Sequence, residues 1–134
     1  MKIAYLIDTD WIIHYLTGNL AIIKRLWEFR PEGLAVSILS VAELYEGVYY
    51  SRNPMASQKS ADNFLENLSI LELNLEICGI FGRQRGKLRK QGNMIGDLDL
   101  LIAATALHHN LTLLTNNVRH FERLEGLRIF SLAP

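Results

Sequence analysis

The chain has 134 residues, of which 49% are hydrophobic and 21% charged, and its formal net charge is zero. This length and composition predict one globular domain, 1–134, with a buried core, and exclude an intrinsically disordered chain. A neutral chain is also not a globally basic nucleic-acid-binding protein, so a nucleic-acid site would depend on a local basic patch or a bound metal.

Neither a disulfide nor a membrane anchor is expected. The only cysteine, Cys78, falls in an apolar helical pattern and is predicted to be a small core residue. The N-terminal apolar run is broken by Asp8 and is too short for a signal peptide. No apolar stretch approaches the roughly 20 residues that a membrane span requires. We therefore expect a cytoplasmic protein.

Short apolar runs alternate with segments of helical periodicity along the chain. The apolar runs predict strands at 2–7, 34–38, 70–73, 111–115 and 127–130. The helical spacing predicts helices at about 11–16, 20–27, 40–49, 56–67, 75–91 and 97–109. Strands separated by helices indicate an α/β fold, a three-layer α/β/α sandwich with a central, mostly parallel sheet.

Several aromatic side chains fall on the apolar stripes of these helices. Trp11 and Trp27 are predicted to be packed, and so are Tyr45 and Tyr49, which follow the i, i+4 spacing of a buried face. A role of the tyrosines in an interface is the alternative.

Acidic residues recur near the carboxyl ends of the predicted strands. Asp8 follows the first strand, and Glu43 lies in the helix after the second. Asp97 and Asp99 begin the helix that leads into the fourth strand, which is itself followed by Asn116 and Asn117. Because right-handed crossovers bring the carboxyl ends of parallel strands to one edge, we expect these side chains to converge.

Each acid also has a purely structural interpretation. Asp8 is a favoured helix N-cap, Ser40 and Glu43 have the spacing of a capping box, and Asp97 and Asp99 suit a helix N-terminus. Taken together, however, carboxylates within a few ångströms repel each other, and burying that repulsion without a cation is costly. An all-oxygen cluster suits Mg²⁺ or Mn²⁺. It therefore predicts a metal-dependent enzyme of phosphate chemistry.

Four blocks of the sequence resemble the PIN-domain ribonucleases, and more closely the VapC-type toxins of bacterial and archaeal toxin–antitoxin pairs. They are Leu6–Asp10, Ser37–Leu44, Asp99–Ala106, and Leu114–Asn117 followed by Phe121. The resemblance extends from residue 3 to about residue 130. The set of blocks in this order is specific, whereas any one of them alone would be weak.

The resemblance implies that Asp8, Glu43 and Asp99 are the catalytic acids, which hold Mg²⁺ or Mn²⁺. Thr9 matches the small hydroxyl residue beside the first acid. The family often has a fourth acid after the fourth strand, where this chain has the amide Asn117.

This departure bears on a second metal ion. Its coordination shell would then need Asp97 or a water. The secondary candidates for the site are Asn117, Asp97 and Thr9.

By the same resemblance, the chain is a metal-dependent endoribonuclease that cleaves RNA, typically stems or loops of tRNA or rRNA. The ion would activate water for attack on the scissile phosphate. A small VapB-type antitoxin would block the site, and such toxins commonly form homodimers. The basic helix with Arg83, Arg85 and Lys87 is a candidate contact for the RNA backbone, or else a solvated helix face.

The histidines give no metal or triad spacing. They are His14, His108, His109 and His120, and none is interpreted as catalytic; only His120, near the Asn117 turn, merits a test.

Other functions fit parts of the pattern. Asp8-Thr9-Asp10 after a strand mimics the D-x-D of haloacid-dehalogenase-like phosphatases, but no Gly follows Asp10 and the chain is short for that fold. A receiver-like regulatory domain lacks its phosphoacceptor Asp around 73–75. A non-catalytic PIN-like binding domain stays open, since Asn117 departs from the family pattern.

Overall fold

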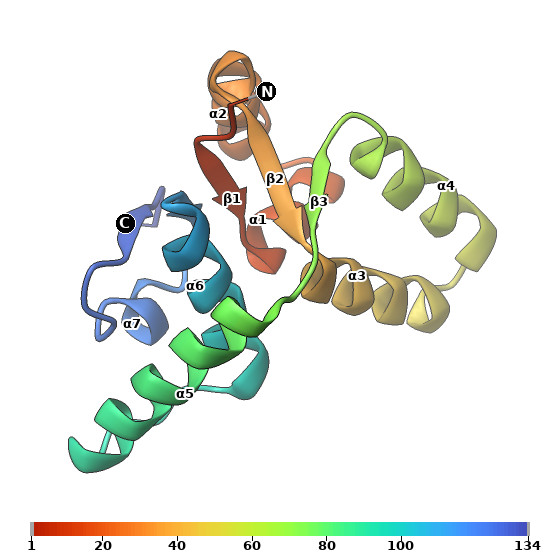
Figure 1. The fold of residues 1–134 in the computed structure, drawn as a ribbon. Helices are drawn as coiled ribbons and strands as arrows, with labels where there is room; N and C mark the ends of the chain where they lie inside the picture. Colours follow the sequence, from red (N-terminus) through yellow and green to blue (C-terminus); the bar gives the residue numbers. More distant parts are fainter. Residues whose placement is uncertain (1, 134) are drawn as a thin grey trace.

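Parallel strands form the centre of the fold in the computed structural model, which describes residues 2–133 (Figure 1). The strands are β1 Tyr5–Ile7, β2 Leu34–Ser37, β3 Ser69–Leu71, β4 Thr112–Leu114 and β5 Arg128–Phe130. Their order is β3-β2-β1-β4-β5, and every neighbouring pair is parallel. β1 is therefore the central strand, and all strands end at the same edge of the sheet.

Helices cover both faces of this sheet. They are α1 Thr9–Leu16, α2 Leu20–Phe29, α3 Ile38–Tyr50, α4 Pro54–Leu65, α5 Leu75–Lys90, α6 Asp97–His109 and α7 Val118–Phe121, with a 3-10 helix η1 at Arg30–Glu32. Leu6 packs with α5, α6 and α7, whereas Ile7 packs with α1 to α4. Successive strand residues point to opposite faces, so β1 contributes to two cores. The predicted α/β/α sandwich is confirmed.

Two helices have other N-cap residues than predicted, which changes the interpretation of their acids. α3 begins at Ile38 because Ser37 is the N-cap and its hydroxyl accepts from the Leu39 N–H at 3.1 Å. Glu43 is then too far into the helix for the capping box predicted with Ser40. α6 has Gly96 as its N-cap, so Asp97 is the first helical residue rather than the cap.

Four side chains predicted to be packed lie at the surface. Trp27 is 56% exposed and Tyr49 is 73% exposed. Each of the four side chains directly follows a buried residue of its helix. They are Trp27, Tyr45, Tyr49 and Cys78. Because one residue turns a helix by about 100°, these side chains leave the core-facing stripe. Trp11, by contrast, is fully buried as predicted.

The remaining differences are small. α4 runs from Pro54 to Leu65 instead of 56–67, because Asn53 caps it and Pro54 suits the first helical position. The single turn of α7 was not predicted. Within residues 2–133, no helix has both the length and the apolar character needed to cross a membrane.

Candidate active site

Asp8 lies at the carboxyl end of the central strand and is the N-cap of α1. One carboxylate oxygen, Oδ1, accepts at 2.9 Å from the N–H of Thr9, the first residue of α1. The other, Oδ2, accepts from the Thr115 hydroxyl at 2.7 Å, across from the end of β4. Asp8 is only 2% exposed. The capping interpretation is thus correct for one oxygen but leaves the burial of the whole carboxylate unexplained.

This burial has an electrostatic consequence. Desolvation and, next, the charge of Asp10 raise the pKa of Asp8 from its ordinary value of 3.8 to about 7, and Asp99 acts in the same direction. The hydrogen bonds from Thr115 and Thr9 lower the pKa, but by less than burial raises it. This position at the sheet edge therefore disfavours the ionised form of Asp8, which a bound cation would stabilise.

Asp10 belongs to this cluster, although it was not predicted to be part of the metal site. Its Oδ2 accepts from the Asn116 N–H at 2.8 Å, and its Oδ1 accepts from the Trp11 N–H at 2.8 Å. The signal was present in the D-x-D spacing, because the second acid of such a pair falls in the first turn of the helix that the first acid caps.

Glu43 is linked to the cluster through Thr9. The Thr9 hydroxyl lies 2.8 Å from Glu43 Oε1 and 2.9 Å from Ser40 Oγ. A hydroxyl carries one hydrogen, so donating it to the carboxylate leaves Thr9 to accept from Ser40. Thr9, the small hydroxyl residue beside Asp8, thus orients the Glu43 carboxylate.

Asp99 is half-buried in the first turn of α6. Its Oδ2 lies 3.1 Å from His120 Nδ1, on α7. His120 has no partner at a regular spacing in the sequence, and for that reason it was not predicted to be catalytic. Only the fold brings residues 99 and 120 together.

Of the secondary candidates, Thr9 lies within the cluster, whereas Asp97 and Asn117 lie at its margin. The Asp97 side chain is 81% exposed and pairs with Arg85. Asn117 is exposed and makes no side-chain capping bond, while its N–H donates to Thr115 Oγ1 at 3.0 Å. In contrast to that of Asn117, the side chain of Asn116 is fixed by a tertiary contact, because its Oδ1 accepts from Trp11 Nε1 at 2.9 Å.

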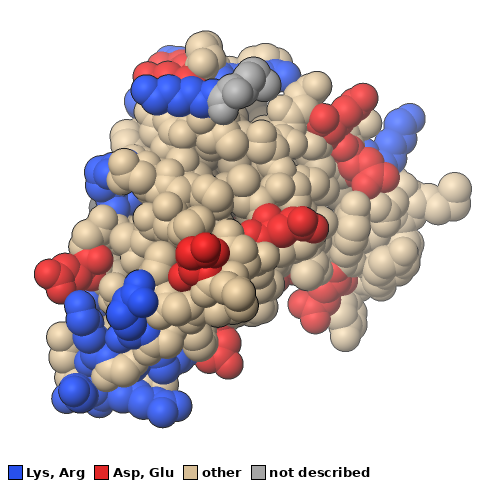
Figure 2. All heavy atoms as spheres, viewed as in Figure 1, with Lys and Arg blue, Asp and Glu red and all other residues tan. Residues whose placement is uncertain are grey.

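Of the three basic residues predicted to contact RNA, one is not available. Arg85 is 9% exposed, and its guanidinium donates to Ile95 O and Asp97 Oδ1, so that prediction is wrong for Arg85. Arg83 and Lys87 are exposed. Figure 2 shows Lys and Arg side chains gathered at the lower left, over the carboxyl-terminal half of α5.

The donor chemistry of the cluster fits a hard divalent cation. No three His, Cys, Asp or Glu side chains of residues 2–133 form a ready-made metal site. However, Mg²⁺ keeps several waters and is commonly bound by only one or two carboxylates. The cluster offers carboxylate oxygens, and the pKa of Asp8 is raised first by burial and next by the charge of Asp10, two effects that a bound cation would offset. The residues present therefore fit Mg²⁺ or Mn²⁺ with part of its shell made of water.

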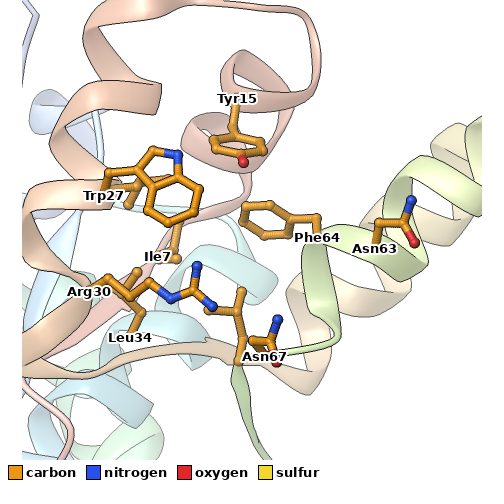
Figure 3. Close-up of a pocket in the computed structure, with 10 residues that line it drawn as sticks. Ile7, Tyr15, Trp27, Arg30, Leu34, Asn63, Phe64 and Asn67 are labelled. Carbon is orange, nitrogen blue, oxygen red and sulfur yellow. The ribbon is translucent and has the colours of Figure 1, made fainter.

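A separate cavity of about 200 Å³ lies between α2 and α4 (Figure 3). In the figure Trp27 and Arg30 face Phe64 and Asn67 across it. None of the clustered acids lines this cavity, although its lining includes Ile7, which precedes Asp8. The candidate active site is therefore the carboxylate cluster at the sheet edge and not this cavity.

Comparisons with known proteins agree with the geometry. A family model described as PIN domain matches residues 5–127. Ribonuclease VapC1 of Haemophilus influenzae is 35% identical over 126 residues, covering 92% of this chain and 94% of the relative. The tRNA(fMet)-specific endonuclease VapC of Shigella flexneri is 27% identical over 124 residues, with 92% and 94% covered.

Solved structures give the same result. A crystal structure of VapBC2 from Rickettsia felis, bound to a DNA fragment from their promoter, matches with a TM-score of 0.91 and 29% identity. The match covers 96% of this chain and 98% of the other. These findings exclude the haloacid-dehalogenase-like and receiver-like interpretations. The chain belongs to the PIN-domain family and, within it, to the VapC ribonucleases.

Proposed function

We propose that this chain is a metal-dependent endoribonuclease and the toxin of a toxin–antitoxin pair. The observation that carries the proposal is the buried Asp8 carboxylate at the end of β1, whose pKa is raised to about 7 by burial and by its acidic neighbour. A buried acid with a strongly shifted pKa, at the carboxyl edge of a parallel sheet, is typical of a functional site. The names of the related ribonucleases support RNA as the substrate.

Asp8, Glu43 and Asp99 are the acids that we propose hold Mg²⁺ or Mn²⁺. When bound, the ion would supply Lewis-acid stabilisation of charge on the phosphate and would activate water. The protein's own part is orientation. Thr115 and the Thr9 N–H hold the two oxygens of Asp8, while the Thr9 hydroxyl holds Glu43.

The substrate that we propose is structured RNA, such as tRNA or rRNA. One relative is named for its specificity for tRNA(fMet), which supports tRNA as the first RNA to test. Arg83 and Lys87 are exposed on α5, which packs against the Asp99-bearing α6, so phosphates next to the cleaved bond would lie within reach of basic side chains.

The proposed partners are a small VapB-type antitoxin and a second copy of the chain, and the proposed location is the cytoplasm. Several solved relatives are VapBC complexes, which supports the antitoxin. Light scattering of the chain alone and with a co-expressed antitoxin measures both associations. A monomer that no antitoxin binds would contradict them.

Cleavage of total RNA and of purified tRNA by the chain, with Mg²⁺, Mn²⁺ or EDTA, tests the enzyme. We expect discrete fragments that require the metal and disappear with Asp8→Asn and Asp99→Asn, both folded by circular dichroism. The matched control is Asp62→Asn, an exposed carboxylate on α4. Metal binding by the wild type without any cleavage would instead support a non-catalytic PIN-like binding domain.

A further inference from the structure

Arg85 is a buried arginine that the proposed chemistry does not use. It is 9% exposed, although arginine is rarely buried unless it is paired. Its Nη1 donates to the Ile95 carbonyl at 2.9 Å, and its Nη2 donates to Asp97 Oδ1. The Phe81 ring lies beneath the guanidinium, 5.2 Å from its carbon to the ring centroid. The guanidinium is thus held by three groups, two of them on another segment of the chain.

That segment is the connection from α5 to the start of α6. Residues 91–96 contain neither helix nor strand. Gly96, the N-cap of α6, has no side chain to accept from the free N–H groups of the first turn. The start of α6 therefore lacks the usual local cap, and Arg85 holds it on both sides of Gly96, at Ile95 and at Asp97.

Asp99 follows Asp97 by two residues, in the same first turn. Any shift of this turn relative to α5 moves the Asp99 carboxylate relative to Asp8, which is fixed by the sheet. We propose that Arg85 is a positioning residue, which sets the place of Asp99 in the metal site through its bonds to Ile95 and Asp97. Asp97 then serves as the partner of Arg85 and not as a metal ligand. The inference rests on the proposed function, because Asp99 is a metal ligand only under it.

The test is the Mn²⁺ affinity of the metal-free full chain, measured by calorimetry and by the electron paramagnetic resonance signal of free Mn²⁺. We expect Arg85→Gln to weaken Mn²⁺ binding by about tenfold, as for other residues that orient a metal ligand. Arg85→Lys keeps the charge but not the planar fork, so it should restore only part of the affinity. RNA cleavage should then recover at higher Mn²⁺ concentration, with little change in the KM for RNA.

Two reference variants make the result decisive. Leu88→Ala creates a cavity one turn further along α5, at a side chain that is 1% exposed, and should lower stability without changing Mn²⁺ affinity. If Arg85→Gln and Leu88→Ala both bind Mn²⁺ like the wild type, Arg85 is merely structural and the inference fails. If Arg85→Gln does not fold, wild-type affinity in a folded Arg85→Lys overturns it equally. Asp99→Asn tests the proposed function separately, because wild-type Mn²⁺ affinity in that variant would refute the metal site itself.

Discussion

The Thr115 hydroxyl donates a 2.7 Å hydrogen bond to Asp8 Oδ2, and both residues are buried. Thr115 follows the end of β4, and Asp8 follows the end of its neighbour β1. The Asp8 N–H also donates to the Leu114 carbonyl at 2.9 Å. The central acid of the site is therefore fixed by the sheet and not only by the helix that it caps.

Thr115→Val tests this bond, since it removes the hydroxyl at nearly constant volume. We expect a loss of about 1–3 kcal/mol in the free energy of unfolding, because a buried carboxylate oxygen loses its donor. RNA cleavage should also fall, since Asp8 loses its orientation. Urea unfolding and a cleavage assay measure both. Thr105→Val is the control: its buried hydroxyl donates to the Leu101 carbonyl of its own helix, away from the clustered acids, and cleavage should not change. Equal behaviour of the two variants would show that the Thr115 bond has no special role.

The stability of the metal-free protein should fall as the pH rises. Asp8 has a pKa of about 7 in the fold against an ordinary 3.8, so the folded state binds its proton more tightly than the unfolded chain. The protonated Asp8 therefore contributes to the free energy of unfolding in full below about pH 4, and this contribution is lost as the pH rises through 7. Three pKa units correspond to an upper bound of about 4 kcal/mol.

Asp8→Asn provides the comparison that isolates this effect. Burial lowers the pKa of His109, which acts in the opposite direction as the pH falls below 6.5, but both proteins contain His109. Urea unfolding in EDTA between pH 5 and 8.5 should show the wild type losing stability relative to Asp8→Asn. Parallel curves would mean that Asp8 is ionised across this range.

Binding of a divalent metal ion should restore the stability that the metal-free protein loses at high pH. At pH 8, Mg²⁺ or Mn²⁺ at a hundred times its dissociation constant should stabilise the wild type by about 2.7 kcal/mol. Asp8→Asn and Asp99→Asn should show little of this gain, whereas Asp62→Asn should show all of it. Thermal unfolding with added Mn²⁺ or EDTA measures the difference. A full gain in Asp99→Asn would place the ion elsewhere.

Much of the site could be predicted because it depends on local pattern. Asp8 and Glu43 each follow a strand of parallel connectivity, so their convergence follows from topology. Other side chains that complete the site were given no role from the sequence: Thr115 lies within the Leu114–Asn117 block and His120 lies just outside it. They reach Asp8 and Asp99 only through tertiary contacts across 107 and 21 residues.

The fold shows the same division. Strand positions were predicted within a few residues, because short apolar runs bounded by turns are a strong signal. Burial was predicted wrongly at Trp27 and Tyr49, because their helical spacing placed them on the apolar stripe, whereas in the structure each lies one residue beyond it. The prediction that Arg85 contacts RNA was also wrong. A basic residue in a basic helix is expected to be exposed, and the sequence does not show that Ile95 and Asp97 bind this one inside the fold.

The exposed basic residues of α5 should contribute to RNA affinity. For single-stranded contacts, each phosphate neutralised adds about 0.7 to the slope of log affinity against log salt. The double variant Arg83→Gln and Lys87→Gln should therefore bind RNA more weakly at low salt, with a slope reduced by about 1.4. Fluorescence anisotropy of a labelled tRNA, in the cleavage-inactive Asp8→Asn background, measures it. Lys24→Gln with Lys59→Gln, exposed on other helices, should leave the slope unchanged. If both pairs behave alike, α5 is a solvated face.

His120 should affect cleavage through Asp99. Its Nδ1 lies 3.1 Å from Asp99 Oδ2, and the His120 side chain is 54% exposed, so its loss should cost little stability. His120→Ala removes the one side-chain partner of Asp99 found among the described residues, and we expect kcat to fall about tenfold, the value of one hydrogen bond to a charged group. His120→Asn, whose amide can still donate, should recover part of the rate. A contact with RNA instead of Asp99 would raise KM and leave kcat unchanged, so steady-state kinetics on tRNA distinguishes the two. The control His108→Ala, on the distant end of α6, should alter neither constant.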